Sequence, residues 1–195
     1  MKKFFTDKLT ANITDNNVRE KGANQVEKLL RQQEGFGLRP VVILCIGSDR
    51  YTGDSLGPLI GTDLQEKTTA TVFGSLDCPV HAGNLVETVN IINSHYYHPI
   101  IIAVDACLGR KSEVGNIEIW PGALQAGVAV GNCLPWVGHL AIIGVVNSGG
   151  QHGYWDLQCT PLSIVVKLSK VISGILEDAC FSIAKECQTV KLVNE

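Results

Sequence analysis

The sequence lacks the features that mark several protein classes. No apolar run reaches the roughly 18 residues that a membrane-spanning helix needs. The N-terminal stretch carries two lysines but no apolar core of the kind found in a signal peptide. No group of lysine and arginine residues is larger than a pair, and the formal net charge is −3. We therefore expect neither a membrane partner nor a nucleic-acid partner.

Recognisable metal and nucleotide motifs are also missing. The seven cysteines form no Cys-x-x-Cys pair and are odd in number, which is typical of buried thiols in a reducing, cytoplasmic compartment. Residues 47–54, GSDRYTGD, match neither the GxGxxG dinucleotide pattern nor the Gly-Lys-Ser/Thr ending of a P-loop. The two acids of this loop would repel a phosphate. We expect no nucleotide cofactor.

What remains is a chain in which strands and helices alternate. Its 195 residues are 45% hydrophobic and 18% charged, which suits one globular domain with a substantial core. Sequence patterns predict strands at 41–46, 70–74, 100–105, 117–120 and 140–147, and helices at 18–33, 56–67, 84–97 and 161–187. This order is typical of an α/β fold with a mostly parallel sheet and helices on both faces. We expect residues 1–38 to be an N-terminal helical segment packed on the core, and residues 39–190 to form the α/β domain.

Two aspartates are the main candidates for chemistry. Asp54 follows the loop after the first predicted strand, and Asp105 directly follows the apolar run at 100–104. Ligands of parallel sheets bind at the carboxyl ends of the strands. If the two strands are neighbours, the carboxylates face each other there. Such a pair can share a proton, activate a water molecule or hold a metal ion.

Structural roles for the same residues stay open. Asp54 is a good residue for a helix cap, although Pro58 favours the first helical position, which would make Gly57 the cap. Asp105 could cap a helix or form a turn bond. A loop histidine such as His81 is more often structural than catalytic.

Other loop residues are candidates for binding the substrate. Asp49 and Arg50 would form an ion pair in the simplest interpretation, and Ser48 and Thr52 would bond the backbone of the turn. Residues 122–132 are uncharged and glycine-rich, so their backbone N–H groups could approach a ligand, or the segment could be a plain crossover. The candidates for binding are Ser48, Asp49, Arg50, Thr52, His81, Gly127, Gly131 and Asn132.

The segment CIGSDRYTGDSLGP at residues 45–58 resembles the signature of the YyaC-like sporulation proteins of spore-forming bacteria. These are similar to the spore germination protease, in which two aspartates matching Asp54 and Asp105 are implicated in activity. The pattern is more distantly similar to the hydrogenase maturation endopeptidases (HybD-like). The resemblance implies a phosphorylase/hydrolase-like α/β fold, a protein or peptide substrate, and the cytoplasm of a spore-forming bacterium.

The HybD-like endopeptidases also bind nickel through an acidic residue of the first loop, the aspartate of a Val-Asp-Ala segment and a histidine. Asp54 and Asp105 match the two acids, whereas the third ligand has no clear counterpart. His139 and His81 are the candidates for it.

Three functions follow from these observations. The first is a peptidase-like hydrolase that uses Asp54 and Asp105 as an acid pair, without a cofactor, with glycine-loop N–H groups stabilising the oxyanion. The second is a non-catalytic sporulation protein that binds a peptide or partner in the same crevice. The third is a divalent-metal-dependent endopeptidase or a metal-binding protein. A homo-oligomer is compatible with each of them.

Overall fold

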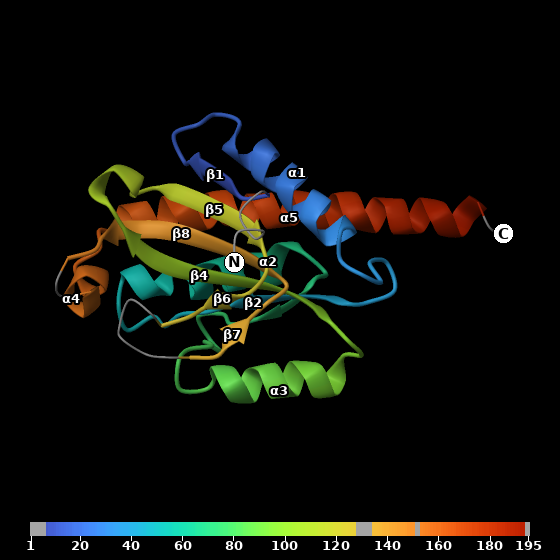
Figure 1. Ribbon diagram of the computed structural model, residues 1–195, viewed down its shortest axis with the longest axis horizontal. Coiled ribbons are helices and arrows are strands. Elements are labelled where there is room, and N and C mark those ends of the chain that lie inside the picture. Colours follow the sequence, from blue (N-terminus) through green and yellow to red (C-terminus); the bar gives the residue numbers. More distant parts are fainter. Residues whose placement is uncertain (1–6, 128–133, 151–152, 194–195) are drawn as a thin grey trace.

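A six-stranded mixed sheet forms the centre of the computed structural model, which describes residues 7–127, 134–150 and 153–193. Its strand order is β1-β5-β8-β4-β2-β3 (Figure 1). The strands are β1 (Leu9–Asn12), β2 (Val41–Cys45), β3 (Thr71–Phe73), β4 (Ile100–Gly109), β5 (Asn116–Pro121) and β8 (Leu140–Ser148). The pairs β3–β2, β2–β4 and β4–β8 are parallel, while β5 and β1 add an antiparallel edge.

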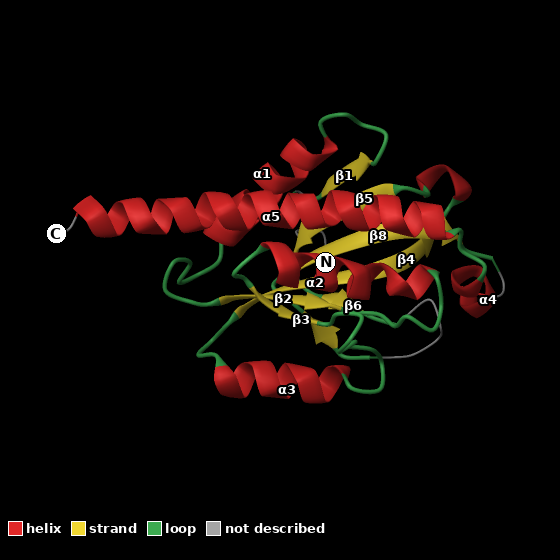
Figure 2. Cartoon of the chain, turned by 180° about the vertical axis from the view of Figure 1, so that it is seen from behind, coloured by secondary structure: helices red, strands yellow, loops and turns green. Residues whose placement is uncertain are grey.

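Helices cover the two faces of the sheet unequally. The first face packs against α1 (Val18–Arg31), α2 (Leu56–Lys67) and α5 (Leu162–Val193), and Figure 2 shows α2 and α5 lying across it. The second face packs against α3 (Leu85–His95) and a small sheet formed by β6 (Leu124–Gln125) and β7 (Trp136–Val137). The fold is thus a mixed α/β domain with a mostly parallel sheet.

The central strands follow directly from their composition. β2 and the first half of β4 are runs of branched apolar residues buried on both faces, as expected for interior parallel strands. Alternate side chains of β4 enter the two different cores: Ile102 and Val104 face α2 and α5, whereas Ile101 and Ala103 face α3. Asp105 continues the second series, so its carboxylate belongs to the α3 face.

Several expected boundaries were wrong. β4 does not end at Asp105 but runs to Gly109, because its second half pairs with β8 through a bulge at Cys107/Leu108. The N-terminal segment is not only helical, since Leu9–Asn12 pairs with β5 as an edge strand. A short helix, α4 (Gly153–Gln158), follows β8 in a stretch for which no element was predicted. The division of the chain at residue 38 stays a prediction.

Helix α5 is the longest element of the protein. It crosses the first face of the sheet, and its C-terminal part extends beyond the sheet (Figure 1). Among the described residues, no helix is both long and apolar enough to cross a membrane.

Candidate active site

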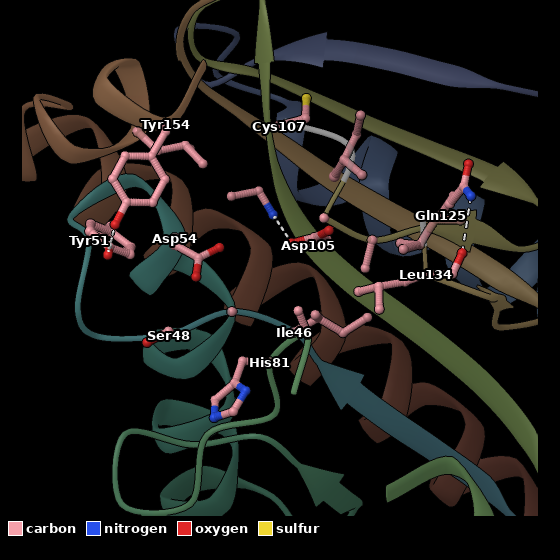
Figure 3. A pocket seen from close by; sticks show the side chains of 18 of the residues that line it. Ile46, Ser48, Tyr51, Asp54, His81, Asp105, Cys107, Gln125, Leu134 and Tyr154 are labelled. Atoms are coloured by element: carbon pink, nitrogen blue, oxygen red, sulfur yellow. Dashed lines mark hydrogen bonds between the residues drawn. The ribbon is translucent and has the colours of Figure 1, made fainter. Parts of the chain in front are cut away.

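A cavity of about 580 Å³ lies on the α3 face of the sheet, beside the carboxyl end of β2. Loops after β2 and β3, strands β4, β5 and β8, the β6–β7 sheet and α4 all contribute to its walls. Figure 3 shows that both candidate aspartates point into it. Parallel sheets place their ligand sites at this position, where loops following neighbouring strands meet.

Asp54 is held by a tight turn after β2. The Ser48 N–H donates to the Asp54 carbonyl (3.1 Å), and the Asp54 N–H donates to the Tyr51 carbonyl (3.0 Å). Gly47 adopts φ +145°, and a Cβ there would overlap the Asp54 carbonyl oxygen. The turn therefore requires glycine at this position. Asp54 sits in the 3-10 turn Gly53–Ser55 that leads into α2.

The helix-cap interpretation of Asp54 is wrong. Ser55 is the N-cap of α2, and no side chain caps this helix end. Pro58 is the third helical residue, not the first, so Gly57 is not the cap either. The Asp54 carboxylate is therefore free of a capping role and available in the cavity.

Asp105 occupies the floor of the cavity inside β4. Asp105 is only 8% exposed. The carboxylate Oδ1 accepts a hydrogen bond from the Ala106 N–H at 2.8 Å. β4 is a direct neighbour of β2, as the facing of the two carboxylates requires, since Val104 pairs with Cys45 in a parallel ladder. One residue further, Asp105 lies just beyond the end of β2, where the Asp54 turn begins.

Burial raises the pKa of both carboxyl groups, and the charge of Asp54 acts in addition on that of Asp105. Burial raises the pKa of Asp105 well above its usual value, the negative charge of Asp54 raises it further, and the Ala106 N–H opposes the shift. Burial also raises the pKa of Asp54, but the Ser48 N–H and the His81 ring counteract it. The pKa values of both acids are thus raised, that of the buried Asp105 more strongly, so Asp54 ionises before Asp105 as pH rises. A pair of this kind holds one proton between two carboxyl groups over a range of pH.

The other candidate residues separate into two groups. Ser48, Arg50, His81 and Gly127 line the cavity together with the aspartates. Asp49 and Thr52 are not part of its lining. Gly131 and Asn132 lie outside the described residues.

Hydrogen bonds between side chains and the backbone stabilise the polar loop at residues 48–55. The Ser48 Oγ accepts a hydrogen bond from the Arg50 N–H at 3.3 Å, which is the expected kind of turn bond. The Thr52 carbonyl, not its hydroxyl, takes part by accepting from the Ser55 Oγ at 2.7 Å. The expected Asp49–Arg50 ion pair does not form in the part of the chain that the structure describes, and both side chains are exposed.

The histidines do not complete a metal site with the acids. His139 lies at the opposite end of β4, where its Nδ1 accepts a hydrogen bond from the Ile101 N–H at 3.1 Å. That position is four residues before Asp105, or about 13 Å along a strand at roughly 3.3 Å per residue. His81 is near Asp54, but its Nδ1 accepts from the Gly83 N–H at 3.1 Å. Across residues 7–127, 134–150 and 153–193, no three His, Cys, Asp or Glu side chains converge on a common point. The donor set described here does not fit a nickel site.

Residues 10–175 match the model of a family described as "Protein of unknown function (DUF1256)". The chain is also 45% identical over 137 residues to "Uncharacterized protein YyaC" of Bacillus subtilis (strain 168), covering 69% of this chain and 67% of that protein. This chain belongs to the DUF1256 family. The resemblance to YyaC-like proteins seen in the segment at residues 45–58 is confirmed.

The fold of this DUF1256 protein is shared with a solved protease structure. The chain is similar to the NiFe hydrogenase maturation protease HycI from Thermococcus kodakarensis KOD1, with a TM-score of 0.50 and 18% identity. The similarity covers 79% of this chain and 97% of that one. At that level of identity the comparison shows a common fold, in agreement with the HybD-like architecture expected from the sequence.

Several cavity residues were not foreseen from the sequence. Tyr51 and Tyr154 meet edge to face, with ring centroids 4.7 Å apart, and their hydroxyl groups are hydrogen-bonded. This contact links the Asp54 turn to α4. Tyr51 lies inside the segment at residues 45–58, so it could have been predicted as a site residue. Nothing in the local sequence pattern around Tyr154 indicates a helix.

Cys107 also lines the cavity, two residues after Asp105 on the same face of β4. Burial, followed by the negative charges of Glu118 and Asp105, raises the pKa of its thiol to about 12. The thiol is therefore neutral near pH 7 and does not act as a nucleophile there.

Proposed function

We propose that this protein is a peptidase-like hydrolase that cleaves a peptide bond with the Asp54/Asp105 pair. One observation carries this proposal: two electrostatically coupled carboxyl groups with unequal burial point into the same cavity. Hydrolysis by an acid pair needs one neutral and one ionised carboxyl group at the same pH. The shared fold with a maturation protease is compatible with this chemistry.

The unequal environments assign the two roles. Asp54, with its carboxylate near the Ser48 N–H and His81, acts as the general base and takes a proton from the attacking water. Asp105, whose burial favours the neutral form of its carboxyl group, donates its proton to the substrate carbonyl oxygen as the C–O bond to water forms. The tetrahedral intermediate then collapses: Asp54 returns its proton to the departing amine nitrogen, the C–N bond breaks, and Asp105 recovers its proton from the hydroxyl group.

A glycine at the cavity wall supports the same step. Gly127 lines the cavity with φ +74°, a conformation that glycine adopts without strain. Its backbone N–H is proposed to donate to the developing oxyanion. We further propose that this activity belongs to the cytoplasm of a spore-forming bacterium, which the resemblance to YyaC-like proteins supports.

A second candidate is a protein that binds a peptide in this cavity without cleaving it. The apolar part of the lining, which includes two tryptophans, favours it, because such walls hold a peptide whether or not it is cleaved. The described side chains do not form the ligand set that a metal-dependent endopeptidase needs.

Sequencing of new peptide termini tests the hydrolase. The purified protein is incubated with a proteome-derived peptide library, and new N-termini are counted by mass spectrometry. We expect Asp54→Asn and Asp105→Asn to lose at least about a hundredfold in cleavage rate, the smallest usual contribution of a general acid or base. Asp49→Asn is the matched control, since Asp49 is in the same loop but outside the cavity lining.

The control is expected to stay within about twofold of wild type. Full cleavage by either site variant would contradict the acid-pair mechanism. A wild-type protein that releases no new termini would contradict hydrolysis and leave the binding protein as the better function.

A further inference from the structure

The cavity has an apolar half that the acid-pair chemistry does not use. Trp120, Leu124, Leu134, Trp136 and Ile143 form its walls, and Figure 3 shows Leu134 on the far side of Asp105 from the Tyr51/Tyr154 contact. These residues come from β5, β6, β7, β8 and the segment before β7. We call these five residues the apolar subsite.

The charges around the cavity restrict what can occupy the apolar subsite. Among the described residues of the lining, Arg50 is the only side chain with a permanent positive charge, and Asp54 and Asp105 are acidic. A phosphorylated or otherwise polyanionic ligand would be repelled by the two acids. A carbohydrate would need many polar partners, which these five residues do not offer. An uncharged apolar group is the complementary ligand.

Trp136 is placed as an anchor for such a group. The residue is 68% exposed although its side chain is large and apolar. Its strand is fixed, because β7 pairs with β6 in register and the Gln125 side chain donates to the Leu134 carbonyl at 3.0 Å. A tryptophan on a paired strand, left open at a cavity rim, is the kind of residue that dominates binding energy when a partner covers it.

We propose that the apolar subsite binds a bulky apolar side chain of a peptide, with its backbone placed across Asp54 and Asp105. This inference rests on the proposed function, because a hydrolase that cleaves a peptide bond at Asp54 and Asp105 needs a subsite beside them that holds the peptide. The volume of about 580 Å³ exceeds one side chain and leaves room for the flanking residues. The apolar subsite would therefore determine which peptide bonds the protein accepts.

Binding can be measured separately from cleavage. The host protein carries Asp54→Asn and Asp105→Asn, so that bound peptides stay intact, and Trp155→Phe. Of the three tryptophans of the chain, this leaves Trp120 and Trp136, which both line the cavity. Blocked octapeptides with Trp, Phe, Leu, Ala, Ser or Asp at one central position are titrated while tryptophan fluorescence is recorded, or by calorimetry for the Trp peptide.

Two exposed tryptophans provide a matched comparison for the subsite. In a host with Trp155 restored, Trp136→Ala is compared with Trp155→Ala by calorimetry. Trp155 is 61% exposed on α4 and does not line the cavity. Trp136→Leu retains an apolar side chain and serves as a milder variant, and circular dichroism confirms that each variant is folded.

We expect the Phe, Leu and Trp peptides to bind at least about tenfold more tightly than the Ser and Asp peptides. Trp136→Ala should weaken the binding of the apolar peptides about tenfold, and Trp136→Leu should weaken it less. Trp155→Ala should leave their affinity unchanged. Equal affinities for all peptides, or equal effects of Trp136→Ala and Trp155→Ala, would overturn the subsite. N-acetyltryptophanamide binding as tightly as the Trp octapeptide would overturn the peptide as its occupant.

The two proposals fail in different ways. Selective binding of apolar peptides by the host protein, together with no cleavage by the wild type, would support the apolar subsite and contradict the hydrolase. Cleavage at the same rate whatever the central residue of the peptide, and by Trp136→Ala as fast as by the wild type, would support the hydrolase and overturn the subsite.

Discussion

At the scale of single residues, Asp105 occupies a position that is unfavourable for a carboxylate. The side chain is buried among apolar residues of the α3 face, and one backbone N–H is its hydrogen-bond donor. An ionised carboxylate there is penalised by burial and by the charge of Asp54. A position that costs stability and opens into a cavity is more typical of function than of structure.

Replacing Asp105 should therefore change how stability depends on pH. Between the ordinary carboxyl pKa and the raised pKa of Asp105, the folded protein binds more protons than the unfolded chain, so stability falls as pH rises. In Asp105→Asn this contribution is absent. We expect the variant to gain stability relative to wild type as pH rises from 4 to 8, as measured by urea unfolding at each pH.

The Asn side chain can still accept the Ala106 N–H, so the local hydrogen bond is retained. Asp49→Asn, at an exposed position, should follow the wild-type curve. Parallel stability curves for Asp105→Asn and wild type over this range would show that Asp105 has no raised pKa.

At the scale of elements, two glycines let α2 lie directly on the sheet. A Cβ at Gly57 would overlap the Ile46 carbonyl oxygen, and a Cβ at Gly61 would overlap the Gly74 carbonyl oxygen. This close approach fixes the N-terminal end of α2, and with it the turn that carries Asp54. The segment at residues 45–58 carries its Leu-Gly-Pro ending for this structural reason, whereas its Asp54 lines the cavity.

Gly61→Ala tests this contact. In an exposed helix the change would stabilise by about 1 kcal/mol. Here we expect a loss of at least about 2 kcal/mol in the free energy of unfolding, because the clash is with backbone that cannot rotate away. Gly174→Ala in α5 is the control, since its methyl group meets the end of the Arg19 side chain, which can shift without moving any backbone. Similar changes in both variants, measured by urea unfolding, would contradict the tight packing of α2.

The elements also show how far the sequence could predict the site. Apolar runs located β2, the first half of β4 and β8, and their parallel order placed Asp54 and Asp105 at one end of the sheet. The second half of β4 could not be predicted from the sequence, because the polar Asp105 interrupts the apolar run. Only pairing with β8 continues the strand beyond it. The six-residue α4 has no periodicity to reveal it, and the two-residue β7 gave no sign that Trp136 would reach the cavity.

At the scale of the whole molecule, β1 covers an edge of the sheet. It pairs with β5 from Leu9↔Ile119 to Asn12↔Asn116, and the Lys8–Glu118 ion pair (2.6 Å) lies beside this ladder. Without β1, the backbone of β5 would be an open edge next to the buried Ile117 and Ile119. An open edge of this kind pairs readily with other chains.

Removal of residues 1–12 should therefore destabilise the protein and promote its association. We expect a loss of about 2–4 kcal/mol, since each lost backbone hydrogen bond contributes about 1 kcal/mol. Sedimentation should show aggregates or higher oligomers. Lys8→Ala, which removes the ion pair but keeps the strand, should cost less than about 1 kcal/mol and leave sedimentation unchanged. A truncated protein that sediments and unfolds like wild type would contradict the role of β1.

Carbon NMR of the aspartate carboxyl groups shows whether Asp54 and Asp105 hold one proton between them, as the proposed mechanism requires. The titration of Asp105 is followed in wild type and in Asp54→Asn. We expect Asp105 to titrate well above its ordinary range in wild type, and at a lower pH in Asp54→Asn, because the neighbouring negative charge is gone. An Asp105 that titrates near the ordinary value of about 3.9 in both proteins would contradict the coupled pair and the mechanism built on it.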